Sequence, residues 1–235
     1  MAPATTQKSQ VRGQALAFSL IVEGLTFFLY IVIVIAHANR RERKMDYLLA
    51  LDKAVFLWIN NQWANRCLDA FFSAITWLGN GWIIFSLVAI FFAVKRPAYL
   101  HQHLPWIIGV MLLSGLCIFA LKKMIPRPRP LTDFAPLIEA GKVHIHVLGG
   151  QLRYRSFPSG HTQTAFAAAT YLCFLLPRWT PLFIALAIAV GLSRIYLGAH
   201  FPFDVIGGGA VGVALALGTW WLRKKLLKPP LTPQS

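Results

Sequence analysis

Long apolar runs constrain this chain more than any other feature of its sequence. Several of them reach the ~20 residues that an α-helix needs to cross the hydrocarbon core of a bilayer. Hydrophobic residues make up 57% of the 235 residues and charged residues only 13%, and the mean hydropathy is +0.57. Soluble domains are seldom so apolar. The sequence therefore predicts an integral membrane protein of the all-α class.

Six apolar runs are predicted to be transmembrane helices. After the first, residues 47–63 mix apolar side chains with Asp52, Lys53 and Asn60, which predicts an interfacial amphipathic helix rather than a span. The proline-rich residues 126–158 are expected to form an extracytoplasmic loop, in which 143–147 and 151–156 have the pattern of a small hairpin. The six expected spans are residues 14–36, 75–94, 104–121, 162–176, 181–197 and 203–221.

These segments divide the chain into four parts. Residues 1–13 are polar and are expected to be disordered, and residues 226–235 form a C-terminal tail. Residues 14–100 hold the first two spans and the interfacial helix. Residues 101–225 hold spans three to six and the polar motifs described below, so this part is expected to be the functional core.

The basic side chains fall mainly between the apolar runs. A net charge of +15 could indicate a nucleic-acid-binding protein, but basic residues beside apolar runs are typical of membrane flanks. Anionic membrane lipid is therefore the expected partner, and nucleic acid is not. Lys95, Arg96, Arg178 and the basic C-terminal end share one side if there are six spans, which predicts that both termini are cytoplasmic. The basic cluster 40–44 then lies outside, where we expect it to contact anionic headgroups.

Three polar islands, far apart in the sequence, return to the outer side of the membrane in this topology. Taken singly, each has an ordinary explanation: basic residues at span ends are commonly topological anchors, and a histidine near an aspartate can be a structural hydrogen bond. Their convergence at one level favours a functional site. The islands are Lys122, Arg127, Arg129 and Pro130 after span three; Ser159, Gly160 and His161 at the start of span four; and Ser193, Arg194, His200 and Asp204 between spans five and six.

Five of these residues could bind an anion. The side chains of Lys122, Arg129 and Arg194 can surround one, and the arginine fork matches the geometry of phosphate oxygens. Backbone N–H groups around Ser159 and Gly160 point outward from the start of a helix, where the helix dipole also favours negative charge. These residues therefore predict a phosphate-binding site.

Two histidines and one aspartate could perform chemistry on that phosphate. His161 and His200 provide a nucleophile and a proton donor. Asp204, four residues after His200, can accept the other ring N–H and fix the tautomer of that histidine. Metal binding by His144 and His146 is a weaker possibility, because two alternating residues on a strand are a poor ligand set.

The three islands contain motifs that resemble the three-part signature of the type 2 phosphatidic acid phosphatase superfamily. The resemblance covers residues 122–204, and the six-span layout is similar, whereas residues 1–100 carry no diagnostic motif. The matching motifs are Lys122-x6-Arg129-Pro130, Pro158-Ser159-Gly160-His161 and Ser193-Arg194-x5-His200-x3-Asp204.

The resemblance implies a role for each site residue. His200 would attack phosphorus to form a phosphohistidine, Asp204 would orient it, and His161 would protonate the leaving oxygen and later activate water. Such enzymes require neither metal nor cofactor, because cationic side chains neutralise the charge of the transition state. The phosphate oxygens would be bound by Lys122, Arg129, Ser159, Gly160 and Arg194.

The resulting interpretation is a bacterial inner-membrane enzyme that hydrolyses a lipid phosphate or pyrophosphate at the periplasmic or extracellular face. Candidate substrates are undecaprenyl pyrophosphate, phosphatidylglycerophosphate and phosphatidic acid. Residues 131–157, which include Arg153 and Arg155, are expected to contribute to the headgroup pocket. The alternatives are a lipid phosphotransferase or lipid A phosphatase that uses the same site, and a non-catalytic lipid-binding or transport protein. The last is disfavoured because binding alone needs only the cations.

Overall fold

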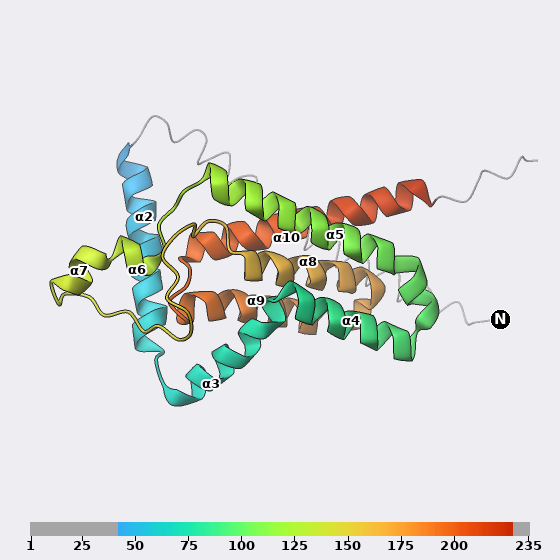
Figure 1. Ribbon diagram of the computed structural model, residues 1–235, viewed down its shortest axis with the longest axis horizontal. Helices are drawn as coiled ribbons and strands as arrows, with labels where there is room; N and C mark the ends of the chain where they lie inside the picture. The colour runs from blue at the N-terminus through green and yellow to red at the C-terminus, as the bar shows by residue number, and fades with distance from the viewer. Residues whose placement is uncertain (1–41, 228–235) are drawn as a thin grey trace, which may run out of the picture.

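A computed structural model describes residues 42–227 of the chain. The predicted N-terminal segment 1–13, the predicted first span 14–36 and residues 228–235 lie outside the described residues. Helices and loops make up the described part, which contains no β-strand (Figure 1). The α-helices are α2 (Glu42–Leu57), α3 (Arg66–Ile75), α4 (Gly81–Lys95), α5 (Pro97–Met124), α6 (Pro130–Asp133), α7 (Ala135–Glu139), α8 (Gly160–Leu175), α9 (Thr180–Tyr196) and α10 (Pro202–Leu226).

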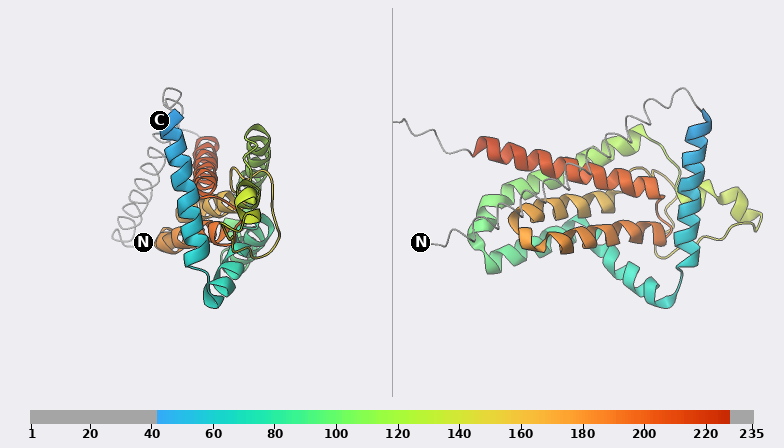
Figure 2. Two further views of the ribbon diagram at one scale, coloured as in Figure 1. Left: turned by 90° about the vertical axis from the view of Figure 1, so that its left-hand side faces the viewer. Right: turned by 180° about the vertical axis from the view of Figure 1, so that it is seen from behind.

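Five of these helices run side by side along the length of the molecule, and α2 lies across one end of them (Figures 1 and 2). The lengthwise helices are α4, α5, α8, α9 and α10. Among the described residues, three segments are each long and apolar enough to cross a membrane: Pro97–Met124, Pro177–Tyr196 and Pro202–Leu226. They correspond to the predicted spans at 104–121, 181–197 and 203–221. The chain is therefore an integral membrane protein, as its composition predicts.

The predicted span at 75–94 is bent rather than straight. A 3-10 turn, Thr76–Gly79, continues α3 and meets α4 at Asn80, and the segments Arg66–Gly79 and Gly81–Lys95 are inclined by 74°. Asn80 starts the new helix because its side-chain oxygen accepts hydrogen bonds from the N–H groups of Trp82 (3.0 Å) and Ile83 (3.3 Å), as an N-cap residue does. Only as a bent pair are these helices long enough to cross a membrane.

Helix α8 is the buried centre of the bundle. It covers the predicted span at 162–176, but its 16 residues are fewer than the ~20 that cross a bilayer. It packs against α9 on one side and α10 on the other. A Cβ atom on Gly208 of α10 would lie 2.3 Å from the Ser159 carbonyl oxygen, and one on Gly212 would lie 2.2 Å from that of Gln163. These glycines therefore let α10 approach the start of α8 closely.

The predicted hairpin in the loop before α8 is wrong. Neither 143–147 nor 151–156 forms a strand, because their backbone groups have partners elsewhere. The amide of Asn60 makes two hydrogen bonds to His146, donating to its carbonyl oxygen and accepting from its N–H, each at 2.8 Å. The second predicted strand instead pairs with the segment after α5, through Arg129 N–H to Arg153 O (3.1 Å) and Ser156 N–H to Arg127 O (2.9 Å).

Helix α2, followed by the π-helical turn Trp58–Gln62, occupies the predicted amphipathic segment 47–63. It binds the end of the bundle through Phe56, whose ring centroid lies 6.0 Å from that of Phe134 and 5.3 Å from that of Phe201. Asp52 of the same helix is buried and accepts a hydrogen bond from the N–H of Phe203 at 2.8 Å. The helix thus covers the turn that leads into α10.

Candidate active site

The end of the bundle covered by α2 brings together residues from all three polar islands. His200 lies in the turn between α9 and α10 and is only 3% exposed. The turn depends on Gly198, which has a φ of +73°, a backbone conformation that glycine adopts without strain. The N–H groups of Ala199 and His200 both donate to the Arg194 carbonyl oxygen at 3.1 Å. The histidine is therefore held directly beyond the last turn of α9.

The contact between Arg129 and His200 defines the protonation of the imidazole. Nη1 of Arg129 lies 3.3 Å from Nε2 of His200. A guanidinium only donates hydrogen bonds, so Nε2 presents its lone pair and the ring proton is on Nδ1. Nδ1 lies 3.5 Å from the Oδ2 atom of Asp204. Burial, together with the charges of Arg129 and Arg194, lowers the pKa of His200 to about 3 against the opposing effect of Asp204. His200 is therefore neutral at pH 7, with Nε2 available as a nucleophile.

Asp204 is fully buried and fixed by several donors. Its Oδ2 atom accepts hydrogen bonds from the N–H of Phe201 at 2.8 Å and the hydroxyl of Ser156 at 2.5 Å. Its Oδ1 atom accepts one from Nη1 of Arg127 at 2.8 Å. The carboxylate consequently has little freedom to leave His200.

Arg127 and Asp52 complete this network, and sequence reasoning gave neither a role. The guanidinium of Arg127 forms ion pairs with both Asp204 and Asp52 and lies 4.5 Å from the centroid of the Phe201 ring. Arg127 was visible in the first polar island. Asp52 carried no such signal, because an acidic residue in an amphipathic segment is usually a solvated one. Ser156 was missed for the same reason, being one hydroxyl in a polar loop.

Three cations lie near enough to His161 for their charges to affect it. The charges of Arg194, Arg129 and Lys122 all act on the imidazole of His161. Arg194 is 8% exposed, donates from Nη1 to the Thr76 hydroxyl at 2.8 Å, and has an Nε–H with no acceptor among the described residues. Buried donors normally have acceptors. A cluster of cations with a free donor fits an anion such as phosphate.

Lys122 and Arg129 are also tied to the loop before α8. The ammonium of Lys122 donates to the Arg155 carbonyl oxygen at 2.6 Å, and Nε of Arg129 donates to that of Tyr154 at 2.8 Å. Arg155 has a φ of +56°, which is uncommon for a residue with a side chain and is often found at functional sites. The loop backbone therefore positions both cations.

The start of α8 differs in one respect from the sequence-based expectation. The N–H of Ser159 is already used, because it donates to the Asp204 carbonyl oxygen at 2.9 Å. The Ser159 hydroxyl accepts a hydrogen bond from that of Thr162 at 2.9 Å and keeps its own proton to donate. The N–H groups of Gly160 and His161 lie in the first helical turn, where no intrahelical acceptor exists. The donors expected here are thus the Ser159 hydroxyl and the next two amides.

The hydrogen bonds of His144 and His146 go to residues outside this cluster. Nε2 of His146 is 2.8 Å from Oδ1 of Asp69, which also accepts a hydrogen bond from the Tyr196 hydroxyl at 2.6 Å. Within residues 42–227, no three His, Cys, Asp or Glu side chains form a cluster that could hold a metal ion. His146 is a structural link between α3, α9 and the loop.

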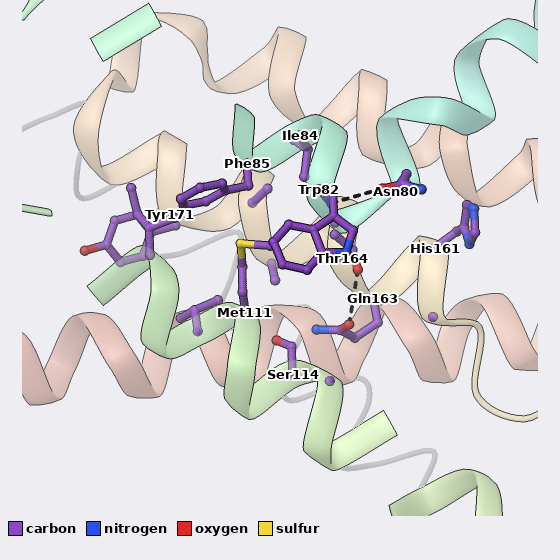
Figure 3. A pocket seen from close by; sticks show the side chains of 18 of the residues that line it. Asn80, Trp82, Ile84, Phe85, Met111, Ser114, His161, Gln163, Thr164 and Tyr171 are labelled. Atoms are coloured by element: carbon purple, nitrogen blue, oxygen red, sulfur yellow. Dashed lines mark hydrogen bonds between the residues drawn. The ribbon is translucent and has the colours of Figure 1, made fainter. Parts of the chain in front are cut away.

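A cavity of about 490 Å³ adjoins the site between α4, α5 and α8 (Figure 3). His161 and Gly160 belong to its lining. Most of the other lining side chains are apolar, among them Phe85, Val88, Ile107, Val110, Met111 and Ile118. The arrangement therefore places a cluster of cations next to an apolar chamber.

Comparison with known proteins finds a matching family model and similar sequences. The model of the PAP2 superfamily matches residues 103–228. The lipid A 1-phosphatase of Rhizobium johnstonii is 31% identical over 162 residues, which cover 60% of this chain and 59% of that protein. Phosphatidylglycerophosphatase B of Bacillus subtilis is 29% identical over 208 residues, 81% of this chain and 90% of that one. The match thus spans about three fifths of the first relative and most of the second.

Two crystal structures are similar in fold. That of Aquifex aeolicus LpxE superimposes with a TM-score of 0.58 and 31% identity, covering 72% of this chain and 93% of that one. That of a transmembrane PAP2-type phosphatidylglycerolphosphate phosphatase from Bacillus subtilis superimposes with a TM-score of 0.63 and 25% identity, covering 88% and 98%.

Proposed function

The chain belongs to the PAP2 superfamily, and on that basis we propose that it is a lipid phosphate phosphatase that works through a phosphohistidine. The observation that carries the proposal is the Arg129–His200 contact, because it leaves a neutral imidazole with its Nε2 lone pair beside a cation. A nucleophile in that state attacks phosphorus most readily when cations neutralise the phosphate.

The proposed reaction has two steps. In the first, Nε2 of His200 forms a bond to phosphorus while the bond from phosphorus to the lipid oxygen, or to the bridging oxygen of a pyrophosphate, breaks. His161, which must be in its protonated imidazolium form at this step, gives that oxygen a proton. Asp204 accepts the Nδ1–H hydrogen bond and stabilises the positive charge on the phosphorylated imidazole. In the second step, water attacks phosphorus as His161 removes its proton, the P–N bond breaks, and inorganic phosphate leaves.

The phosphate oxygens would be bound by Lys122, Arg129, Ser159, Gly160 and Arg194. Three of these are cations, so the proposed mechanism needs no metal ion to stabilise the transition state. Arginine is well suited to this role because its fork donates two parallel hydrogen bonds to an anion.

A lipid substrate is supported by the relatives and by the cavity. The relatives described above are named as phosphatases of lipid A and of phosphatidylglycerophosphate, and here an apolar chamber reaches His161. Undecaprenyl pyrophosphate, phosphatidylglycerophosphate, phosphatidic acid and lipid A phosphate all combine such a headgroup with an apolar tail. A lipid phosphotransferase would use the same residues, with a lipid hydroxyl replacing water in the second step.

We further propose six spans with the site on the periplasmic or extracellular side of a bacterial inner membrane. Lys95 lies in the last turn of α4, Arg178 lies in the turn between α8 and α9, and Arg223 lies in the last turn of α10. These ends of the helices are the ones away from α2 (Figure 1). Positive charge of this kind favours the cytoplasmic side. The predicted span at 14–36 would place the N-terminus there as well.

The test is phosphate release by the purified full-length protein from four lipids: undecaprenyl pyrophosphate, phosphatidylglycerophosphate, phosphatidic acid and lipid A. We expect release from at least one of them, and the same rate in EDTA. Loss of activity in EDTA would contradict the metal-free mechanism. Transfer of labelled phosphate to an added lipid acceptor, without release of free phosphate, would favour the phosphotransferase. Binding without turnover of any lipid would favour a non-catalytic protein.

A further inference from the structure

The cavity beside His161 opens at the outer surface of the bundle. Two of its lining residues, Trp82 and Leu112, are 77% and 71% exposed. They lie on α4 and α5, at a surface that faces lipid if these helices cross the membrane. The cavity thus extends from this surface to Gly160 and His161, and a substrate tail could occupy it.

Two polar atoms in this apolar lining have no partner. They are the amide nitrogen Nε2 of Gln163 and the hydroxyl oxygen of Ser114, both with no hydrogen-bond partner among the described residues. Gln163 is 1% exposed and Ser114 is 4% exposed. A buried polar group without a partner costs stability, so such groups are rare in folded proteins. Two of them in one cavity therefore indicate a missing ligand atom.

The free atoms of both side chains can donate hydrogen bonds. The amide oxygen of Gln163 already accepts from the Thr164 hydroxyl at 3.5 Å, which leaves its NH₂ group as the unused part. The serine hydroxyl also carries a proton. In Figure 3 the amide nitrogen of Gln163 and the hydroxyl of Ser114 point toward the same region of the cavity. The atom they lack is therefore an acceptor.

We propose that this acceptor is an acyl carbonyl oxygen of the substrate lipid, in an ester or amide. This proposal rests on the proposed lipid phosphatase function and names the substrate class as acylated lipid phosphates. The position of the donors supports it. Gln163 follows His161 by two residues on α8, about 3 Å along the helix axis, and both residues line the same cavity, so a lipid with its phosphate at His161 can bring a carbonyl to Gln163. In acylated lipids the carbonyls lie a few bonds from the phosphate, whereas polyprenyl phosphates have none.

The experiment compares two lipids that differ only in these carbonyls: diacyl phosphatidic acid and its dialkyl ether analogue. For the purified wild-type protein in detergent micelles, we expect a higher kcat/KM for the ester lipid. Gln163→Leu should lower kcat/KM for the ester lipid by about 3- to 10-fold, the effect of one hydrogen bond, and leave the ether lipid unchanged. Ser114→Ala should act in the same direction and serves if Gln163→Leu does not fold.

Thr170 offers a matched control. Its hydroxyl oxygen is also buried on α8 and has no partner within residues 42–227, but Thr170 is not among the residues that line the cavity. Thr170→Val should therefore preserve the preference for the ester lipid. A change in that preference as large as the one for Gln163→Leu would show a general effect of altering α8 and would overturn the proposal.

The outcomes separate this inference from the function on which it rests. Equal wild-type activity on ester and ether lipids, or an equal loss on both in Gln163→Leu, would mean that the two donors hold a water molecule or serve packing alone. Hydrolysis of undecaprenyl pyrophosphate with no activity on either glycerolipid would reject the carbonyl site and retain the phosphatase. No hydrolysis of any lipid phosphate would reject both.

Discussion

Asp52 of helix α2 and Asp204 of helix α10 bind the same guanidinium group, that of Arg127. Both carboxylates are buried, at 1% and 0% exposure, so each depends on Arg127 for charge compensation. Asp204 also faces His200. Helix α2, which lies outside the residues matched by the family model, is therefore connected to the proposed nucleophile through two ion pairs.

The first prediction concerns this shared guanidinium. Arg127→Met should lower the free energy of unfolding by about 3–5 kcal/mol, because it leaves two buried carboxylates without a cation. Thermal unfolding in detergent, followed by circular dichroism, measures the loss. The control is Lys53→Met, which removes the ion pair to Asp133 (2.7 Å) from a Lys53 side chain that is 41% exposed. An exposed pair contributes about 1 kcal/mol at most, and an equal effect of the two substitutions would contradict the structural role of Arg127.

The second prediction tests Asp52 as a positioning residue. Asp52→Asn keeps the shape of the side chain but removes its charge, so Arg127 is held by Asp204 alone. We expect kcat to fall by about 10-fold with little change in KM, because Asp52 would act on the orientation of His200 rather than on substrate binding. Steady-state kinetics on the lipid found to be hydrolysed give both constants. A rise in KM at constant kcat would place Asp52 in lipid binding instead.

The third prediction concerns the nucleophile. His200→Ala should reduce kcat by roughly 10³-fold or more, as is usual when the nucleophile of a catalytic unit is removed. Phosphate release under saturating lipid measures the loss, and circular dichroism verifies the fold. His144→Ala is the matched control, since His144 is exposed in the same region of the molecule and should retain full activity. Near wild-type turnover by His200→Ala would show that another residue attacks phosphorus.

The fourth prediction is a pH dependence of stability. The pKa of His200 is lowered to about 3 from its ordinary value of 6.5, so between these values the unfolded chain binds a proton that the folded chain does not. Its contribution is complete above pH 6.5 and is lost as the pH falls toward 3. The wild-type unfolding temperature should therefore decrease between pH 7 and pH 4.5. In His200→Asn, which has no imidazole to titrate, the decrease should be smaller. An equal decrease would contradict the buried neutral state of His200.

The sequence alone predicts the apolar helices well. The expected spans at 104–121 and 203–221 lie inside α5 and α10, because a run of apolar residues between basic flanks is a local pattern. The bend at Asn80 lies in the sequence Gly79-Asn80-Gly81, which favours an irregular start to a helix but does not give the angle. Its size depends on how the Asn80 side chain caps α4, which composition does not determine.

Contacts between distant segments were the part that sequence reasoning missed. The sequence of the loop before α8 predicts a hairpin. Instead, the backbone N–H and carbonyl oxygen of His146 form hydrogen bonds with the side chain of Asn60, which lies 86 residues earlier in the chain. The Asp52–Arg127 ion pair likewise joins two segments that are far apart in the sequence. The three motifs could be recognised because each is compact in sequence. The residues that surround them came from segments with no motif of their own.

The last prediction concerns the close approach of α10 to the start of α8. In Gly208→Ala the new Cβ atom would lie 2.3 Å from the Ser159 carbonyl oxygen. Because backbone is the obstacle, α10 must move away, which should cost about 1–3 kcal/mol or more of the free energy of unfolding. The shift would also move Asp204, whose carbonyl oxygen binds the Ser159 N–H, so kcat should fall too. Gly109→Ala on α5 is the control, since its Cβ would meet nothing within 4 Å and alanine favours the helix by about 0.5–1 kcal/mol. If Gly208→Ala were as stable and active as Gly109→Ala, the helices would not need this contact to form the site.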